Sequence, residues 1–580
     1  CIRDSDQGVP YSFGNHNGGK TLIAPVVDVG FGTAPEFEAS GDVSGKIVLV
    51  HRDDDITMWP NSVIEEAASH GAAATVFYGY YGSYPLSNAV AQDAVLPHGI
   101  KQDTVGGTLP AISISIESAT RIKQLLAQGE VQLQIEGRAD LVNEANAESS
   151  NVIAYLPGST RPDEYVIFSA HIDTWWTGTV DDLSGIACVL EYARLFSAAK
   201  AAGIYDNERT LVFASLGAEE LGGPIDTWYN WLVGSYEFVK AHRELVDRTV
   251  IDLNLDMVSL KKTSGRYWVE LSPDANDFLT EAISDLGLTG AVTYYNPAYS
   301  WVDSWSFHAK GGTTSVNVNW VANQDEIYHT QLDTMDYASP EPLKIVLDLY
   351  TLLGMRADSS LVFPFNLQNT LDWAGGYLAS DRASAASESA YFDAAAEALA
   401  TLRAQVILAN AYRDSLIDDY ESATEPEREE INDQADAFNA AMYDARKMIN
   451  VWTLGEGGTA GSWDVFLRSH QHAHDIGSID ATITALQRGR LNQALKALTS
   501  VYSMEWGHRF GEHAYQQVFT WMNDNDRYWG AEWDQQQDYV NVHWIYLGLS
   551  DGTLAQQEAM EALQDVRSSQ LVPWLREDLG

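Results

Sequence analysis

The sequence has little cysteine and little positive charge, and each shortage excludes a class of protein. Its 580 residues include only two cysteines, Cys1 and Cys188, too few for a framework of disulfide bonds. Lysine and arginine together number 35 against 81 aspartates and glutamates, which gives a formal net charge of -46. Because so acidic a chain repels phosphate backbones, we expect no binding to nucleic acid. The chain also lacks any run of about 18 apolar residues, so we expect no transmembrane helix.

The acidic composition fits two settings. A strongly negative surface keeps a protein soluble outside the cell and in salt-rich surroundings alike, and composition does not separate the two. We expect an extracellular or cell-surface location. Cys1 fits either the lipidated cysteine of a processed lipoprotein or the start of a fragment. Cys188 lies in an apolar helical pattern and is expected to be a small core residue.

The hydrophobic patterns divide the chain into regions, as expected for a length beyond that of one core. Short β-rich runs around one helical segment predict a compact α/β domain at 20–137, preceded by an N-terminal segment at 1–19. Between 138 and 370, apolar runs alternate with helical lengths, a pattern typical of a mostly parallel sheet covered by helices on both faces. From 371 to 580, apolar residues recur near every 3.6 positions, which predicts a helical domain.

Side chains of the kind that bind metals follow the predicted strands of the central region. They are His171, Asp173, Asp181, Glu219, Glu220, Asp256 and His329. Each alone is explained more simply as a turn, a cap or an exposed helix start. Together they predict a metal site, because the carboxyl ends of parallel strands gather at one edge of a sheet. Zinc accepts both imidazole nitrogen and carboxylate oxygen, and three carboxylates with one hydroxide would balance two Zn²⁺ ions.

The order of these motifs, His-x-Asp, Asp-x-x-Ser-Gly, Glu-Glu, Asp and Tyr-His-Thr, resembles that of the co-catalytic di-zinc exopeptidases of the aminopeptidase and glutamate carboxypeptidase type. The runs GKIVLVHR and AASHGAAATVFY resemble their protease-associated (PA) domain. The C-terminal region resembles the helical domain of the glutamate carboxypeptidase and transferrin receptor branch. The resemblance implies an α/β zinc-exopeptidase sheet with an inserted PA domain. It also implies a homodimer through the helical domain, with a monomer as the alternative.

The resemblance further implies the ligands of two zinc ions. His171 and Asp256 would hold one ion, Glu220 and His329 the other, and Asp181 would bridge them.

Three more residues receive chemical roles from the same resemblance. Glu219 becomes the general base that takes a proton from the attacking water and passes it to the leaving amine. Asp173 becomes the carboxylate that orients His171. Tyr328, directly before the last ligand, would contact the tetrahedral intermediate.

The expected substrate is a peptide, and the sequence favours cleavage at its amino end. The stretch PAYSWVDSWSFHAKGGTTSVNVNW contains one lysine and no arginine, which argues against a pocket for a C-terminal glutamate. We expect Asp182 or Asp303 to hold the substrate's amino group. Trp175 and Trp176 form an apolar substrate pocket or are ordinary core aromatics, and Trp301 and Trp305 share this ambiguity. The alternatives are a carboxypeptidase or dipeptidase, a cyclase of glutaminyl termini, and a receptor without catalysis.

A second histidine cluster resembles a metal site only superficially. His470, His472 and His474 occupy alternate positions in SHQHAHD, as metal ligands on a strand would. Because the surroundings indicate loop and helix, we predict a polar surface cluster here.

Overall fold

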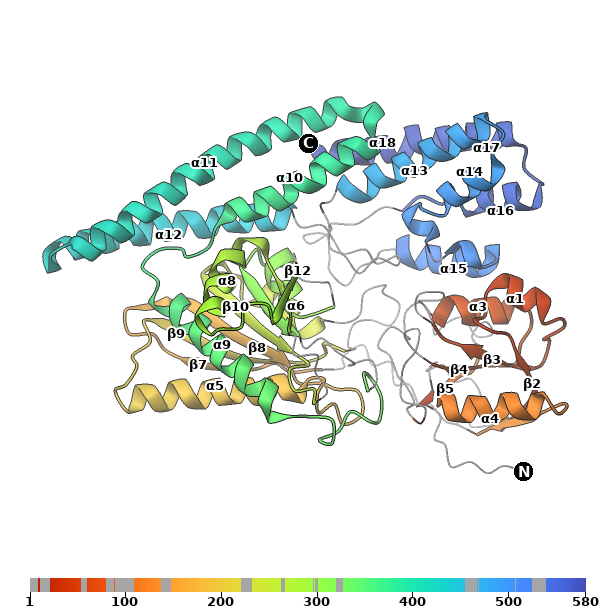
Figure 1. Ribbon diagram of the computed structural model, residues 1–580, viewed down its shortest axis with the longest axis horizontal. Coiled ribbons are helices and arrows are strands. Elements are labelled where there is room, and N and C mark those ends of the chain that lie inside the picture. Colours follow the sequence, from red (N-terminus) through yellow and green to blue (C-terminus); the bar gives the residue numbers. More distant parts are fainter. Residues whose placement is uncertain are drawn as a thin grey trace.

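The computed structural model describes residues 9–10, 21–53, 60–79, 88, 109–136, 148–220, 232–261, 267–295, 297, 301–319, 327–453, 467, 469–505, 507–523 and 539–580. These residues form two sheets flanked by helices and a long helical layer that extends over both (Figure 1).

The smaller sheet lies in the N-terminal part of the chain and has the strand order β1-β5-β4-β3-β2-β6. Its elements are β1 (Val9–Pro10), β2 (Leu22–Asp28), α1 (Ala34–Ala39), β3 (Ile47–His51), α3 (Pro60–Ser69), β4 (Ala74–Tyr78), β5 (Ala111–Ile114), α4 (Ile116–Leu126) and β6 (Gln132–Ile135). Strands β2 to β5 are parallel, and the edge strands β1 and β6 are antiparallel to their neighbours. Of the predicted N-terminal segment, the structure describes only β1, which extends this smaller sheet. The predicted link at 138–150 falls largely outside the described residues.

The larger sheet has seven strands in the order β12-β11-β13-β10-β8-β9-β7. The elements of this region are β7 (Val152–Leu156), β8 (Arg161–His171), α5 (Leu183–Ala201), β9 (Arg209–Leu216), α6 (Val233–Ala241), α7 (Arg243–Asp247), β10 (Thr249–Asp256), β11 (Tyr267–Leu271), η1 (Pro273–Ala275), α8 (Asn276–Asp285), β12 (Val292–Tyr295), η2 (Ser306–Lys310), β13 (Ser315–Asn319) and α9 (Pro340–Ser359). The four apolar runs seen in the sequence are the adjacent parallel strands β13, β10, β8 and β9. Strands β9 and β10 are buried along their whole length, and β8 is buried from Val166 to His171, which explains why these runs lack the alternation of a half-exposed strand.

Helices cover both faces of this sheet. Successive residues of β8 point to opposite sides: Phe168 packs into the core that includes α5 and α9, and Ile167 packs with α6 and α7. Cys188 of α5 is a buried free cysteine in the first of these cores. The predicted mostly parallel sheet with helices on both faces is therefore confirmed.

The C-terminal region is helical, as predicted. Its elements are α10 (Leu367–Ser384), η4 (Ala386–Glu388), α11 (Ser389–Ser422), α12 (Glu425–Thr453), α13 (Ser469–Gln487), α14 (Leu491–Leu498), η5 (Tyr502–Met504), η6 (Gly507–Arg509), α15 (Glu512–Asn523), α16 (His543–Asp551), α17 (Gln556–Val566), η8 (Arg567–Leu571) and α18 (Val572–Leu579).

This helical region contributes to two different cores. Residues of α12 such as Phe438 and Tyr443 share a core with the larger sheet, whereas residues of α13 to α18 such as Ile476 share one with α1 and α3 of the smaller sheet. The long helices α10 and α11 contribute to both cores, and Figure 1 shows them running from above the larger sheet to α13 and α18. A buried contact joins the smaller sheet's α3 to the segment before α15: Glu66 accepts a hydrogen bond from the Gly511 amide at 2.7 Å.

Among the described helices, none is both long enough and apolar enough to cross a membrane.

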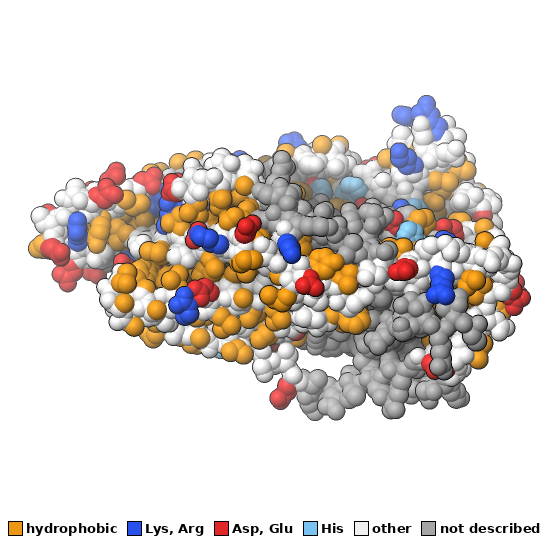
Figure 2. Space-filling view, turned by 60° about the horizontal axis from the view of Figure 1, so that its bottom comes forward, with side chains coloured by type: hydrophobic (Ala, Val, Ile, Leu, Met, Phe, Trp, Pro, Cys, Tyr) orange, Lys and Arg blue, Asp and Glu red, His pale blue; other side chains and the backbone are white. Residues whose placement is uncertain are grey.

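The surface of α5 carries exposed apolar side chains. Figure 2 shows hydrophobic side chains over much of the face that lies at the bottom of Figure 1, where α5 is found. The exposed leucines of this helix are Leu183, Leu190 and Leu195, of which Leu190 is 63% exposed.

Candidate metal centre

The predicted ligands come from the carboxyl ends of neighbouring strands and the loops that follow them. His171 is the last residue of β8, and Asp256 is the last residue of β10. Glu220 follows β9, Asp181 lies in the loop before α5, and His329 lies in a turn before α9. Because β8, β9 and β10 are adjacent and parallel, their ends deliver these side chains to one edge of the sheet.

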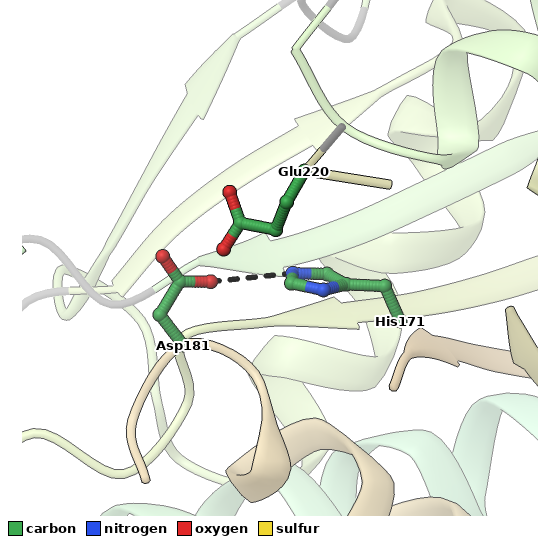
Figure 3. Close-up of side chains that lie close together, drawn as sticks. All are labelled: His171, Asp181 and Glu220. Carbon is green, nitrogen blue, oxygen red and sulfur yellow. Dashed lines mark ion pairs between the residues drawn. The ribbon is translucent and has the colours of Figure 1, made fainter. Parts of the chain in front are cut away.

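Asp181 lies between two groups of side chains. Its Oδ1 is 3.2 Å from Nε2 of His171, and its Oδ2 is 3.2 Å from Nε2 of His329. His171 also lies 4.0 Å from Asp256, and His329 lies 3.1 Å from Glu220. Figure 3 shows the carboxylate of Asp181 facing the imidazole of His171, with the carboxylate of Glu220 beside that of Asp181. The five predicted ligands thus lie close together, with the Asp181 carboxylate between the two histidines.

The donor set fits a divalent cation. All these side chains are buried, and carboxylates outnumber imidazoles in the cluster. Burying an excess of negative charge is costly unless a cation balances it. His171, Asp181 and Glu220 each offer a ligand atom within 4.8 Å of the others. Imidazole nitrogen and carboxylate oxygen are ligands suited to zinc, so the cluster is compatible with zinc.

The pKa values of the cluster reflect the same excess of negative charge. Burial raises the pKa of Asp256 to about 8 and that of Glu220 to about 7, with the charge of Asp181 acting in the same direction on both. Burial opposes the charged form of His329, but Glu220 and Asp181 outweigh it and raise its pKa to about 10. Hydrogen bonds from both imidazoles overcome the effect of burial on Asp181 and lower its pKa. Without a metal ion, protons supply the positive charge that the cluster needs.

The proposed general base, Glu219, lies beside the ligands. Its Oε2 is 3.9 Å from Nε2 of His171, and burial raises its pKa well above the ordinary value.

Asp173 acts on a different partner from the one predicted. The Nδ1 of His171 donates to the backbone carbonyl of Asp173 at 2.9 Å, whereas the nearer carboxylate oxygen is 3.9 Å away. That carboxylate instead accepts the backbone amides of Glu219 at 2.9 Å and Glu220 at 3.0 Å. The expectation that the Asp173 carboxylate orients His171 is therefore wrong in detail. The backbone carbonyl orients the imidazole, and the carboxylate fixes the glutamate pair.

Asp182 does not line an accessible surface. It is fully buried as the N-cap of α5, and its Oδ1 accepts the amides of Gly185 and Met257, each at 3.0 Å. A Cβ added to Gly185 would lie 2.4 Å from Oδ2 of Asp182, so this close approach requires glycine. This placement contradicts the predicted role of Asp182 in holding a substrate's amino group. Asp182 can be grouped with His171 and Asp256 as a third possible ligand, but its Oδ1 is already engaged.

Asp303, the other candidate for the amino group, is also buried, and the charge of His171 in the cluster influences its ionisation. Burial raises its pKa to about 6, while the charge of His171 and the hydroxyl of Ser235 oppose the rise.

The aromatic candidates divide into two kinds. The ring of Tyr328 stacks on His329 with centroids 3.7 Å apart, and the ring of Trp175 lies 6.1 Å from the same imidazole. Trp176 is 39% exposed on the loop that follows β8. By contrast, Trp305 is buried beneath the ammonium group of Lys310, and Trp301 packs against the core formed by the smaller sheet and the C-terminal helices. Trp305 is thus a core aromatic, whereas Trp175 lies beside His329 and Trp176 is exposed on the loop that follows β8.

Left-handed backbone is concentrated at the site. Ala218 (φ 54°) directly precedes the glutamate pair, Met257 (φ 55°) directly follows the last residue of β10, and His329 (φ 51°) is itself a candidate ligand. Trp176 (φ 57°) adds a fourth such residue. Each costs about 1–3 kcal/mol, a cost that proteins retain mainly where function requires the geometry.

Sequence reasoning missed Asp333, which is buried four residues after His329. Its carboxylate accepts the amides of Val180 at 2.7 Å and Asp181 at 3.0 Å. The signal lies in the motif YHTQLD, where an aspartate after a turn is also an ordinary turn residue.

The histidines of α13 form separate ion pairs inside the protein. His470 contacts Asp381, His472 contacts Asp578 at 2.7 Å, and His474 lies 3.7 Å from its neighbour in the chain. His472 is buried, and the other two are half-buried. The prediction of a polar surface cluster is therefore wrong. On a helix, alternate residues point in different directions, so the three do not converge as they would on a strand.

Comparison with known families assigns two parts of the chain. Residues 151–353 match the model of peptidase family M28, and residues 21–122 match that of the PA domain. These matches confirm the resemblance inferred from the motifs and the expected α/β fold with a PA domain.

Individual relatives are distant and longer than the matched stretch. The chain is 30% identical to "Aminopeptidase NAALADL1" of Rattus norvegicus over 241 residues, 36% of this chain and 30% of that protein. It is 24% identical to "Carboxypeptidase Q" of Xenopus laevis, over 44% of this chain and 52% of that protein. A solved zinc aminopeptidase from Bacillus subtilis aligns with a TM-score of 0.43 at 23% identity, over 60% of this chain and 78% of that one.

Proposed function

We propose, from the membership of residues 151–353 in peptidase family M28, that this protein is a zinc-dependent exopeptidase that releases residues from the amino end of peptides. The observation that carries the proposal is the position of Asp181, whose two oxygens each lie 3.2 Å from a different histidine. A carboxylate placed in this way suits two cations that share one ligand.

We infer two zinc ions per chain. His171 and Asp256 would hold one, His329 and Glu220 the other, and Asp181 would contribute to both. When bound, such ions supply a Lewis acid that polarises the scissile carbonyl.

Glu219 is the residue that we propose to transfer the proton. Its backbone amide donates to the Asp173 carboxylate at 2.9 Å, which fixes the main chain of Glu219 beside the ligands. From there the carboxylate takes a proton from the attacking water and returns it to the leaving amine. Tyr328, stacked on His329, is proposed to contact the tetrahedral intermediate with its hydroxyl.

Cleavage at the amino end is supported by the charges near the site. The one lysine between β12 and β13, Lys310, is buried against Trp305. We assign the substrate's amino group to the Asp303 carboxylate, because Asp182 is engaged as the N-cap of α5. Trp175 and Trp176 supply apolar surface for the side chain of the released residue.

The test is an assay of purified protein on two substrate panels, with and without a chelator. One panel has free amino termini, and the other consists of N-acetylated dipeptides. We expect chelator-sensitive release from the first panel only, and much slower release by the Glu219→Gln variant. Release from blocked dipeptides would instead indicate a carboxypeptidase or dipeptidase, and inactivity of a zinc-loaded protein on both panels would indicate a receptor.

We also propose a homodimer through the C-terminal helices. Helix α11 presents exposed apolar side chains, among which Leu408 is 64% and Tyr412 is 45% exposed one turn apart. Light scattering should show a dimer that Leu408→Glu weakens. The matched variant Leu190→Glu, on the exposed face of α5, should leave the dimer intact. The reverse pattern would move the interface to α5, and a wild-type monomer would contradict the proposal.

An extracellular or cell-surface location is proposed as well, on the support of the net charge of -46. Cys1, the candidate for lipidation, lies outside the described residues. Detection of the protein in the surface or secreted fraction of its cells tests this proposal.

A further inference from the structure

We propose that Asp333 is a positioning residue for the metal centre: its carboxylate fixes the main chain that carries Asp181 relative to the turn that carries His329. The inference rests on the proposed metal site but not on the identity of the substrate.

Three contacts join Asp333 to the segment that ends at Asp181. Its Oδ1 accepts the amide of Val180 at 2.7 Å, and its Oδ2 accepts the amide of Asp181 at 3.0 Å. Its backbone carbonyl accepts the amide of Thr179 at 3.4 Å. The side chain is only 2% exposed, so water does not compete for these amides.

At its other end, Asp333 belongs to a tightly bonded turn. Its backbone amide donates to the carbonyl of Thr330 at 3.1 Å. The Thr330 hydroxyl donates to the carbonyl of Ile327 at 2.8 Å and accepts the amide of Leu332 at 3.1 Å. His329 lies inside this turn in a left-handed conformation. A shift of Asp333 would therefore be transmitted to His329 as well as to Asp181.

The two segments that Asp333 joins carry ligands that must meet. Nε2 of His329 and Oδ2 of Asp181 are 3.2 Å apart, although the residues are far apart in sequence. A displacement of a few tenths of an ångström between the segments changes the spacing of the donor atoms. Residues that orient metal ligands in this way typically change metal affinity or activity by about 10–100-fold when they are replaced.

The two hydrogen bonds from the amides of Val180 and Asp181 require a carboxylate at position 333. Both oxygens of Asp333 accept, and each faces an N–H donor. In Asp333→Asn the shape is kept, but one oxygen becomes an NH₂ group that can only donate. Two donors then face each other in a buried place, so one of the two hydrogen bonds is lost and the pair is pushed apart.

A control variant at a similar buried carboxylate distinguishes an effect on the positions of the metal ligands from a general loss of stability. Asp358 is 1% exposed and also accepts two backbone amides, from Arg209 at 2.7 Å and Glu208 at 3.2 Å. Arg209 begins β9, whereas the metal centre lies beyond the end of that strand. Asp358→Asn therefore also replaces a buried, amide-binding carboxylate, which in addition accepts the Tyr205 hydroxyl, at a place far from the ligands.

The experiment compares zinc affinity in the 580-residue wild type, Asp333→Asn and Asp358→Asn by competition with a chelator of known affinity. The thermal midpoint of each metal-free protein is recorded alongside. We expect zinc to bind Asp333→Asn about 10–100-fold more weakly than the wild type. Asp358→Asn should bind zinc like the wild type, even if its thermal midpoint falls further. Asp333→Glu, which keeps both acceptor oxygens on a longer arm, should fall between wild type and Asp333→Asn, and it replaces the Asn variant if that one does not fold.

Two outcomes overturn the inference alone: zinc affinity of Asp333→Asn within about twofold of the wild type, or an equal loss in Asp358→Asn. Weak or absent zinc binding by the wild type overturns the metal site itself, and with it the proposed function. Tight zinc binding with the expected loss in Asp333→Asn supports the inference whatever the protein cleaves.

Discussion

Two clusters of histidines and carboxylates occur in this protein, and they are built differently. At the strand ends, His171 and His329 share one carboxylate, Asp181, and further acidic groups crowd around them. On α13, each histidine has a carboxylate partner of its own, as in the pair of His472 with Asp578. Among the described residues, the groups able to hold a metal all lie in the first cluster.

The comparison shows which features distinguish a metal site from structural ion pairs. Burial does not, because both clusters contain buried members. Convergence on a shared acceptor and an excess of negative charge do, because a metal ion or bound protons must supply the balancing positive charge. A one-to-one ion pair balances its own charge and needs no further partner.

The largest effect is expected from removing the proposed base of the first cluster. Glu219→Gln should lower kcat/KM by about 10²–10⁴-fold, because the amide cannot take the proton of the attacking water. Elemental analysis should show unchanged zinc, since Glu219 is not one of the proposed ligands. Exposed Glu237→Gln, on α6, serves as the control and should keep full activity. Retained activity in Glu219→Gln would break the assignment of the base.

The second prediction compares the loss of one histidine from each cluster. His329→Ala should lose zinc, because one proposed ion loses its only imidazole. His472→Ala should keep zinc but lower the free energy of unfolding by about 1–3 kcal/mol, because buried Asp578 loses its partner. Elemental analysis and denaturant unfolding measure the two quantities. Loss of zinc from His472→Ala would mean that α13 also binds metal.

The third prediction concerns the pH dependence of zinc binding. In the metal-free protein, the pKa of Glu220 is raised to about 7 and that of Asp256 to about 8. Since these carboxyls keep protons that zinc must displace, affinity should fall as pH drops from about 8 to about 6. Calorimetry in buffers of different ionisation enthalpy should detect released protons. An affinity that does not change over this range would contradict the proposed ligand set.

The smallest effect is expected beside α13. Burial raises the pKa of Glu505 to about 7, against the opposing charge of His474. An unfolded glutamate titrates near 4.3, so the folded state holds an extra proton between these values. The contribution of Glu505 to stability is therefore lost as pH rises through about 7. Glu505→Gln should be more stable than the wild type at pH 8 by about 1–2 kcal/mol and equal to it near pH 4. Thermal unfolding at both pH values measures the difference, and a constant offset would show that titration is not the cause.

Much of the site could be predicted because its signals are local. A strand that runs into His171, or a glutamate pair directly after a strand, is visible within ten residues. The parallel arrangement of such strands then places their ends together. The helical C-terminal region was equally visible from its 3.6-residue period. Its division between two cores was not, because helix amphipathicity shows that a face is buried but not against what.

The sequence by itself determined which side chains stand at the strand ends, and hence the kind of chemistry the site supports. Only the tertiary structure decided what the remaining carboxylates do. Asp173 clamps the amides of the glutamate pair, Asp182 caps α5, and Asp333 holds the amide of Val180, which lies 153 positions away. A carboxylate accepts any donor that the fold presents to it, and the donors here are backbone amides that every residue except proline carries. The identity of the donor residues therefore does not reveal these hydrogen bonds, which depend only on how the chain folds.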